Sequence, residues 1–257
     1  MITFSILLIN KLKCYYNNFL ELSENLINVL KLLNVKQKHN LTNQAFNDIL
    51  EIFANGESSL HLAKKKLSEL IDIQPVFVDT CVNSCCAFTG SFAQNVSCHL
   101  CGESRFIMKN NISTNIPRKV STFIPLIDRF RIQYNNPERA MELRYRHHYV
   151  NQDEYENDSI GDLFDGNLYK DLVEDGYFVD ERDIALIGST DGFQLFKQKT
   201  DDCWVVMFIN ANLPPSERVK KENLLISLII PGPSQPKDFN SFLRPVVDEL
   251  KLLEGMI

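Results

Sequence analysis

The chain has 257 residues, enough for one large domain or two modest domains that each bury a core. Its 44% hydrophobic and 23% charged residues are typical of a folded globular protein and exclude wholesale disorder. The net charge of −6 argues against a protein that coats nucleic acid over its whole surface. Basic residues are in excess before residue 120 and acidic residues after it, which predicts segments with different partners.

The first 75 residues are predicted to be helical. Apolar residues recur near a period of 3.6 over residues 1–34 and again over 43–54, where Asn55-Gly56 is expected to end the helix. A third helix is expected over Ser58–Leu70. It carries the run Lys64–Lys66, which is more typical of a solvated helix face than of a phosphate contact.

The opening run MITFSILLIN is apolar but too short to span a bilayer. It also lacks the basic segment and the small-residue cleavage site of a signal peptide. We therefore expect synthesis in the cytosol and no membrane association. In that reducing compartment, paired cysteines indicate metal binding rather than disulfides.

The strongest local motif lies in residues 76–107, here called the cysteine knuckle. Cys81-x3-Cys85 and Cys98-x2-Cys101 are two close pairs separated by twelve residues, and Gly102 follows the second pair. Four thiolates on two turns match the tetrahedral coordination of structural zinc, with no open position for catalysis. The alternative is four buried, reduced thiols without metal.

The remaining three cysteines and one nearby histidine lie outside this predicted set of four ligands. Cys86 is an alternative ligand to Cys85, whereas His99 lies between two ligands and is expected to point away from the metal. Cys14 and Cys203 stand alone and fit small buried hydrophobes.

The middle of the chain is predicted to hold one or two helices over residues 120–149. His147 and His148, next to Arg144 and Arg146, fit a polar helix end better than a metal site. Residues 151–183 are strongly acidic, and we expect a solvated, loosely ordered connector there.

The last third changes character. Short apolar runs bounded by turn residues predict strands over Asp183–Thr190, Asp202–Asn210 and Leu224–Ile230, followed by an amphipathic helix over Asp238–Leu253. Pro245 is expected to kink or restart that helix. Asp191 follows the first strand, where a carboxylate could bind a divalent metal, although Asp191-Gly192 is also typical of a tight turn.

The phrases of the cysteine knuckle resemble those of CACTA-type (En/Spm-like) DNA transposases, as do several phrases that follow in collinear order over roughly residues 40–253. These phrases are CVNSC (81–85), AFTG (87–90), CHLCGESR (98–105), FIPLI (123–127), MELRYRH (141–147), IALIGSTDGF (184–193), NANLPP (210–215), KENLL (221–225), IIPGP (229–233) and LRPVVDEL (243–250).

The resemblance implies a nuclear enzyme of mobile DNA. Its partners would be the ends of the transposon DNA and other transposase chains. Its catalytic domain would be RNase H-like, with acidic residues holding two Mg²⁺ ions, and Asp191 matches the first of these acids. The chain stops at Ile257, before the elements expected to bring the second and third acids. One Asp cannot hold two Mg²⁺ ions, so we expect a fragment or degenerate copy without strand-transfer activity.

We therefore expect an α+β or α/β protein in four parts: a helical region (1–75), the zinc knuckle and its connector (76–119), helices and an acidic connector (120–182), and an incomplete RNase H-like core of three strands and a helix (183–257). Two other hypotheses remain. One is a zinc-stabilised module that binds DNA or protein, and the other is a remnant that folds poorly. The basic residues that favour DNA binding are Lys64–Lys66, Arg105, Lys109, Arg118 and Lys119.

Overall fold

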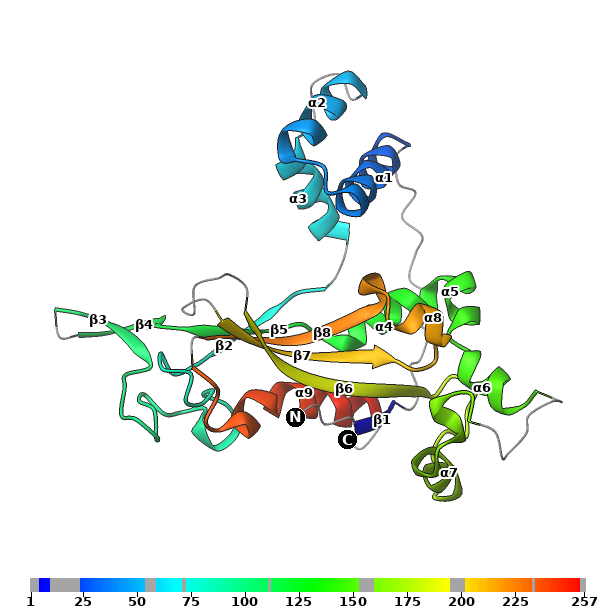
Figure 1. Ribbon diagram of the computed structural model, residues 1–257. Helices are drawn as coiled ribbons and strands as arrows, with labels where there is room; N and C mark the ends of the chain where they lie inside the picture. Colours follow the sequence, from blue (N-terminus) through cyan, green and yellow to red (C-terminus); the bar gives the residue numbers. More distant parts are fainter. Residues whose placement is uncertain are drawn as a thin grey trace. The chain divides into compact units, whose positions relative to one another are not determined.

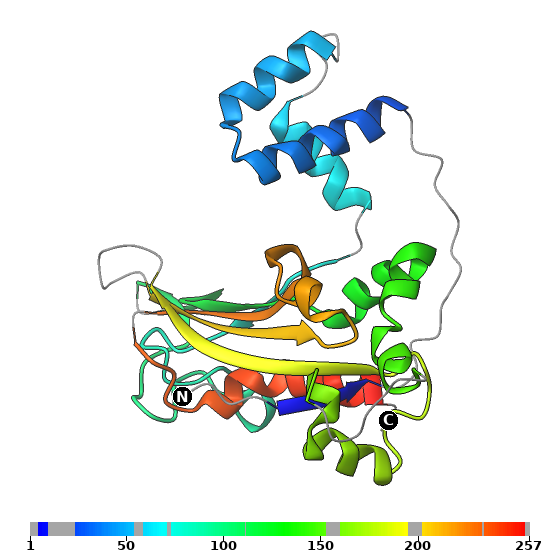
Figure 2. The same cartoon turned by 45° about the vertical axis from the view of Figure 1, so that its right-hand side comes forward.

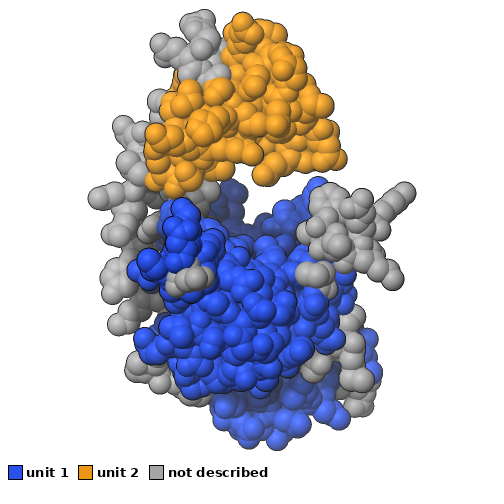
Figure 3. Space-filling model, turned by 90° about the vertical axis from the view of Figure 1, so that its left-hand side faces the viewer, with its two compact units in different colours: residues 1–14, 74–257 blue, residues 15–73 orange. Residues whose placement is uncertain are grey.

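The structure is a computed structural model that describes residues 5–9, 24–53, 59–70, 73–110, 112–152, 160–194, 202–232 and 234–254. The chain divides into two compact units, which Figure 3 distinguishes by colour. One unit comprises residues 1–14 and 74–257, and the other comprises residues 15–73. Each unit is described by itself below.

The smaller unit contains three helices, α1 (Glu24–His39), α2 (Asn43–Phe53) and α3 (Leu60–Leu70). The predicted helix over 43–54 is confirmed, whereas Asn55-Gly56 lies outside the described residues. The Asn47 side chain accepts a hydrogen bond from the Leu60 backbone N–H at 3.0 Å and so joins α2 to α3. A small apolar core holds the helices together, formed by Val29, Leu33, Phe46, Leu50, Leu60 and Ala63.

The helix predicted over residues 1–34 is wrong at its start. Ser5–Ile9 forms strand β1, and residues 10–23 lie outside the described part of the chain. A short continuous apolar run fits a buried strand as well as a helix, so periodicity alone does not decide between them. Antiparallel pairing of β1 with Ile184–Gly188 decides in favour of the strand.

The larger unit is built on a six-stranded antiparallel sheet with strand order β1-β6-β7-β8-β5-β2 (Figure 1). Besides β1, the strands are β2 (Val76–Asp79), β5 (Val120–Phe123), β6 (Ile184–Gln194), β7 (Asp202–Asn210) and β8 (Leu224–Pro231). The strands predicted over Asp202–Asn210 and Leu224–Ile230 are confirmed. Strands from all four predicted parts of the chain thus share one sheet.

Strand β6 is longer than predicted and continues through Asp191-Gly192 to Gln194. Asp191 pairs with Val205 and Gly192 with Trp204, so the interpretation of Asp191-Gly192 as a tight turn is wrong. The long ladder with β7 overrides the local preference of Asp-Gly for a turn, because strand pairing satisfies the backbone groups that a turn would leave exposed.

Helix α9 (Phe239–Glu254) covers one face of the sheet (Figures 1 and 2). Phe242, Val246 and Leu250 pack against Phe208 and Leu228 of the strands in the main apolar core. Buried residues recur along the helix with the spacing of an amphipathic face, as the sequence predicts.

Pro245 lies inside α9, and the helix continues through it rather than restarting. Proline has no N–H to donate to the carbonyl four residues earlier, here that of Ser241. The Thr89 hydroxyl of the cysteine knuckle donates a hydrogen bond to this Ser241 carbonyl instead. A tertiary contact thus replaces the helical hydrogen bond that Pro245 cannot make.

The segment 120–149 begins with strand β5 and continues as three helices, so the prediction of one or two helices is wrong. The helices are α4 (Leu126–Asn135), α5 (Pro137–Glu142) and α6 (Tyr145–Val150). Pro125 separates the strand from α4. The buried Glu249 carboxylate accepts hydrogen bonds from the Leu126 and Ile127 N–H groups at 2.8 and 2.9 Å and caps α4.

The acidic segment is more ordered than predicted. Residues 160–183 contain α7 (Asn167–Glu174) and the 3-10 turn η2 (Leu163–Asp165), while residues 153–159 lie outside the described part. Asp162 is buried in a double hydrogen bond to Arg218 of helix α8 (Pro215–Arg218), at 2.7 and 2.8 Å. The prediction of a solvated connector is wrong here because a buried guanidinium neutralises the acid.

Segments near the knuckle complete the fold. The predicted connector 108–119 contains most of a hairpin of β3 (Phe106–Lys109) and β4 (Ile112–Pro117), which forms a separate two-stranded sheet (Figure 1). Two further 3-10 turns are η1 (Gly90–Phe92) and η3 (Lys221–Asn223). Among the described helices, none has the length and apolarity needed to cross a membrane.

Candidate metal centre

The four predicted cysteines converge. The sulfur atoms of Cys81, Cys85, Cys98 and Cys101 all lie within 4.8 Å of one another, and those of Cys81 and Cys101 are 3.5 Å apart. A tetrahedral zinc ion with ordinary Zn–S bonds would set its sulfurs about 3.8 Å apart. The four thiols therefore fit a single zinc ion in both number and spacing.

Two tight turns place these sulfurs. In the first, the Ser84 N–H donates to the Cys81 carbonyl at 2.8 Å, and Ser84 has a left-handed φ of 55°. In the second, the Gly102 N–H donates to the Cys98 carbonyl at 2.8 Å with φ of 76°, a conformation that favours glycine. Gly102 thus forms a tight turn directly after the second cysteine pair.

Cys86 and His99 have separate positions. The Cys86 sulfur is 3.6 Å from the Cys98 sulfur, yet Cys85, not Cys86, belongs to the group of four. The His99 ring stacks on Phe92 with centroids 4.0 Å apart, and its Nε2 lies 3.9 Å from Asp238 Oδ2. His99 is therefore occupied by contacts other than the thiols, as expected.

The thiols have unequal electrostatic environments. Burial raises the pKa of Cys85 to about 12 and also raises the pKa of Cys81. The backbone N–H of Glu103 lowers the pKa of Cys101 to about 7, because it donates to the thiolate. Buried thiols resist ionisation on their own, so a bound cation is what would hold all four as thiolates.

Lys119 is a further cation beside the thiols. Its ammonium donates to the Val82 carbonyl at 3.3 Å, the Ser84 hydroxyl at 2.7 Å and the Gly232 carbonyl at 2.6 Å. Burial lowers the pKa of Lys119, while the neighbouring Cys81 thiolate opposes that shift. Lys119 thereby connects the first cysteine turn to the end of β8.

The cysteine knuckle is anchored to the main core at several points. The Cys85 carbonyl accepts hydrogen bonds from the Lys237 and Asp238 N–H groups at 3.2 and 2.8 Å, just before α9. The Ala87 N–H donates to the Ser241 hydroxyl at 2.9 Å. A metal at the four cysteines would therefore stabilise a segment that contacts α9 directly.

Three of the basic residues proposed for DNA contact have partners within the larger unit. Arg105 donates to Asp79 and the Ala93 carbonyl, both at 2.7 Å, and Arg118 pairs with Glu103 at 2.6 Å. Together with Lys119, these side chains have internal partners. Lys64–Lys66 are exposed in the smaller unit, and Lys109 is exposed in the hairpin of the larger unit.

Asp191 is exposed on β6, and its Oδ1 accepts a hydrogen bond from the Gly192 N–H at 2.8 Å. The residue directly opposite is Val205, which offers no ligand. Within the part of the chain that the structure describes, the four cysteines are the only group of three or more metal-binding side chains. Asp191 and the described residues around it therefore do not fit a two-Mg²⁺ centre.

His147 and His148 lie in α6, with ring centroids 6.1 Å apart. The Asn151 side chain donates to the His147 carbonyl at 2.8 Å. Neither histidine belongs to the metal-binding group of the described residues, so the prediction of a polar helix end fits both.

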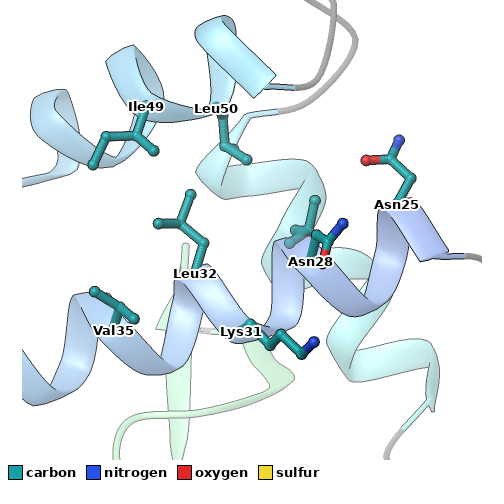
Figure 4. Close-up of a pocket in the computed structure, with 8 residues that line it drawn as sticks. Asn25, Asn28, Lys31, Leu32, Val35, Ile49 and Leu50 are labelled. Carbon is teal, nitrogen blue, oxygen red and sulfur yellow. The ribbon is translucent and has the colours of Figure 1, made fainter.

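Two surface hollows contain no metal-binding cluster. A groove of about 440 Å³ between α1 and α2 is lined by Leu32, Val35, Ile49 and Leu50, with Lys31 as its charged residue (Figure 4). A second hollow of about 500 Å³ lies beside Arg146, whose guanidinium donates to backbone carbonyls, including that of Asp180 at 2.6 Å.

Sequence reasoning missed the ion pair of Asp162 and Arg218, which Tyr145 joins through a hydrogen bond from its hydroxyl to Asp162 at 2.8 Å. The side chains of the pair are 2% and 7% exposed, so this is a structural lock and not an open site. Because acids and arginines far apart in a sequence have no spacing rule, the sequence contains no signal for it.

Comparison with known proteins matches one segment. Residues 163–256 match the model of a family described as Transposase family tnp2. This match supports a protein derived from a DNA transposase. It includes β6, β7, β8, α9 and Asp191, but not the four cysteines. No curated protein and no solved structure matches the chain.

Proposed function

We propose that this chain is derived from a CACTA-type DNA transposase, with a structural zinc site in the cysteine knuckle and the opening part of an RNase H-like catalytic core. The family match over residues 163–256 is the observation that carries the transposase assignment. The collinear phrases before and after residue 163, including those around the cysteines, support the finer CACTA assignment. The family resemblance favours a nuclear location, with transposon DNA and other transposase chains as partners.

Three antiparallel strands in sequential order, followed by a helix on one face, support the RNase H-like part of the proposal. β6, β7 and β8 are neighbours in the sheet, and α9 packs on them through Phe242 and Val246. Asp191 lies on the first of these strands, where the family resemblance places the first catalytic acid.

We further propose that the chain by itself does not cleave or join DNA. Attack of water on a phosphodiester in this family would need two divalent metals held by several oxygen ligands. Among the described residues, Asp191 has no neighbouring carboxylate across the ladder. The described part of the chain therefore supplies one ligand of a site that needs more.

Incubation of the purified chain with supercoiled plasmid and Mg²⁺ or Mn²⁺ tests the proposed lack of DNA cleavage. We expect no nicking above the level of a mock purification. Nicking that Asp191→Ala abolishes would contradict the inactivity. Because Asp191 is exposed, Asp191→Ala should change stability by less than about 0.5 kcal/mol, which makes it a clean variant.

A binding module without catalysis is the second candidate. The exposed run Lys64–Lys66 favours it, because phosphate contacts need accessible cations. In a shift assay at low salt, replacing all three lysines with Gln should weaken DNA binding. Arg118→Gln, which removes a cation already paired with Glu103, is the matched control. Equal binding by both variants, or none by the wild type, would exclude this candidate.

A further inference from the structure

Cys86 is a buried thiol that the proposed zinc site does not use. Its side chain is fully buried, and its sulfur lies 3.6 Å from that of Cys98, which is 2% exposed. Cys86 directly follows Cys85, a member of the group of four, and is not itself a member. A non-ligand thiol thus touches one ligand sulfur.

This contact gives Cys86 a chemical role that the other cysteines do not share. Cys81 and Cys101 are also close, at 3.5 Å, but both are ligands whose sulfurs would be committed to the metal. Cys86 keeps a free S–H while the metal is bound. It is therefore the thiol of the cluster that is free to react with an oxidised neighbour.

We propose that Cys86 and Cys98 form a redox-active pair, in which a peroxide converts them to a disulfide and weakens metal binding. This inference rests on the proposed zinc site. The two sulfurs need to approach by about 1.5 Å to reach disulfide bonding distance. Once Cys98 is consumed, Cys81, Cys85 and Cys101 remain, and three thiolates hold zinc less firmly than four.

The reaction balances with hydrogen peroxide as the oxidant. The Cys98 thiolate attacks one peroxide oxygen, which gives a sulfenic acid and a hydroxide that takes up a proton. The Cys86 sulfur then attacks the Cys98 sulfur, and the Cys86 proton leaves with the hydroxyl group as water. The two cysteines lose two electrons, and the peroxide is reduced to two water molecules. A dithiol reductant reverses the change.

Zinc-loaded full-length protein treated with hydrogen peroxide tests the proposal. Zinc release is followed with a chromophoric chelator, and disulfides are mapped by mass spectrometry of non-reduced peptides. We expect a Cys86–Cys98 disulfide to form together with zinc release, and a dithiol to restore both. Cys86→Ser and Cys86→Ala should release zinc several-fold more slowly, whereas Cys203→Ser, at a buried cysteine outside the cluster, should behave as wild type.

A predominant Cys81–Cys101 disulfide, or unchanged zinc release in both Cys86 variants, would overturn the proposal. Peptide mapping of the wild type alone decides it if the Cys86 variants do not fold. The same mapping on metal-free protein separates this inference from the zinc site. A chain that binds no zinc but forms the Cys86–Cys98 disulfide would refute the zinc site and keep the thiol pair.

Discussion

The cysteine knuckle and the sheet with α9 belong to one compact unit but are stabilised in different ways. The sheet and α9 share a core of apolar side chains that includes Phe208, Leu228 and Phe242. The knuckle has a small cluster in which Phe88 is accompanied by Cys81, Cys85, Cys86 and Cys98. Apolar burial stabilises the first region, whereas a metal held by the cysteine sulfurs would stabilise the second.

The two regions also differ in what they share with known proteins. The family match begins at Leu163, so it covers α9 and three of the six strands of the sheet but not the knuckle. Nevertheless, the knuckle supplies Ala87 to the main core and the Thr89 hydroxyl to α9. The comparison teaches that the knuckle packs into the same compact unit as the segment that matches the family, although the match itself does not include it.

Loss of the metal should produce the largest difference between the regions. Cys98→Ser removes one of four ligands and should cost more than about 4 kcal/mol of unfolding free energy in zinc-containing buffer. Metal analysis should find about one zinc per wild-type chain and far less in the variant. Cys203→Ser is the control outside the cluster. A wild type that unfolds identically with and without a strong chelator would contradict the zinc site.

The buried ion pair of Asp162 and Arg218 tests the part of the larger unit outside the knuckle. Asp162→Asn leaves the buried Arg218 without a counter-charge and should destabilise the protein by about 3–5 kcal/mol in urea unfolding. Glu217→Gln breaks an exposed pair with Lys220 and should leave the midpoint of urea unfolding nearly unchanged. Zinc content should stay unchanged in both variants. Equal stability of the two variants would show that the buried pair stabilises the fold no more than the exposed pair does.

The link between the regions should have an intermediate effect. Thr89→Val removes the donor to the Ser241 carbonyl that Pro245 leaves without its helical partner. We expect a loss of about 1–3 kcal/mol, because a buried carbonyl then lacks a hydrogen bond. Thr89→Ser keeps the hydroxyl and should recover most of this loss. If Val and Ser variants unfold at the same denaturant concentration, the hydroxyl does not support α9.

The smallest expected effect is on the pH dependence of folding stability, through Glu249 of α9. Burial raises the pKa of Glu249 above its ordinary value of 4.5. The folded state then binds a proton more tightly than the unfolded state, so Glu249 favours folding at low pH and loses this contribution as pH rises above 4.5 through the folded pKa. Glu249→Gln should flatten that part of the profile measured by urea unfolding. Glu222→Gln, at an exposed glutamate, is the control.

The sequence predicted the elements that have a clear pattern of apolar residues along their own length. Asp202–Asn210 and Leu224–Ile230 are apolar runs between turn residues, and both are strands. The helix after residue 238 has buried residues at helical spacing. Elements that depend on a distant partner were missed. Val120–Phe123 became a strand only through pairing with β2 and β8.

The same distinction separates the two predicted sites. The spacing of Cys81, Cys85, Cys98 and Cys101 was enough to predict their convergence, because each pair lies on one short turn. The sequence placed Asp191 just after a strand, and only the structure showed that the strand continues through it, so its ligand environment depends on neighbouring strands. Val205 stands opposite it, and no local pattern could show that.

By itself, the sequence determined the strand and helix content of the last third, the four-cysteine cluster and the resemblance to a transposase. These depend on periodicity, on short spacings and on phrases, which are all local properties of the chain. Only the tertiary structure decided that β1, β2 and β5 extend the sheet, that Arg218 neutralises Asp162, and that Thr89 replaces a hydrogen bond lost at Pro245. The physical reason is that buried backbone and charged groups must find partners, and folding supplies those partners from distant parts of the chain.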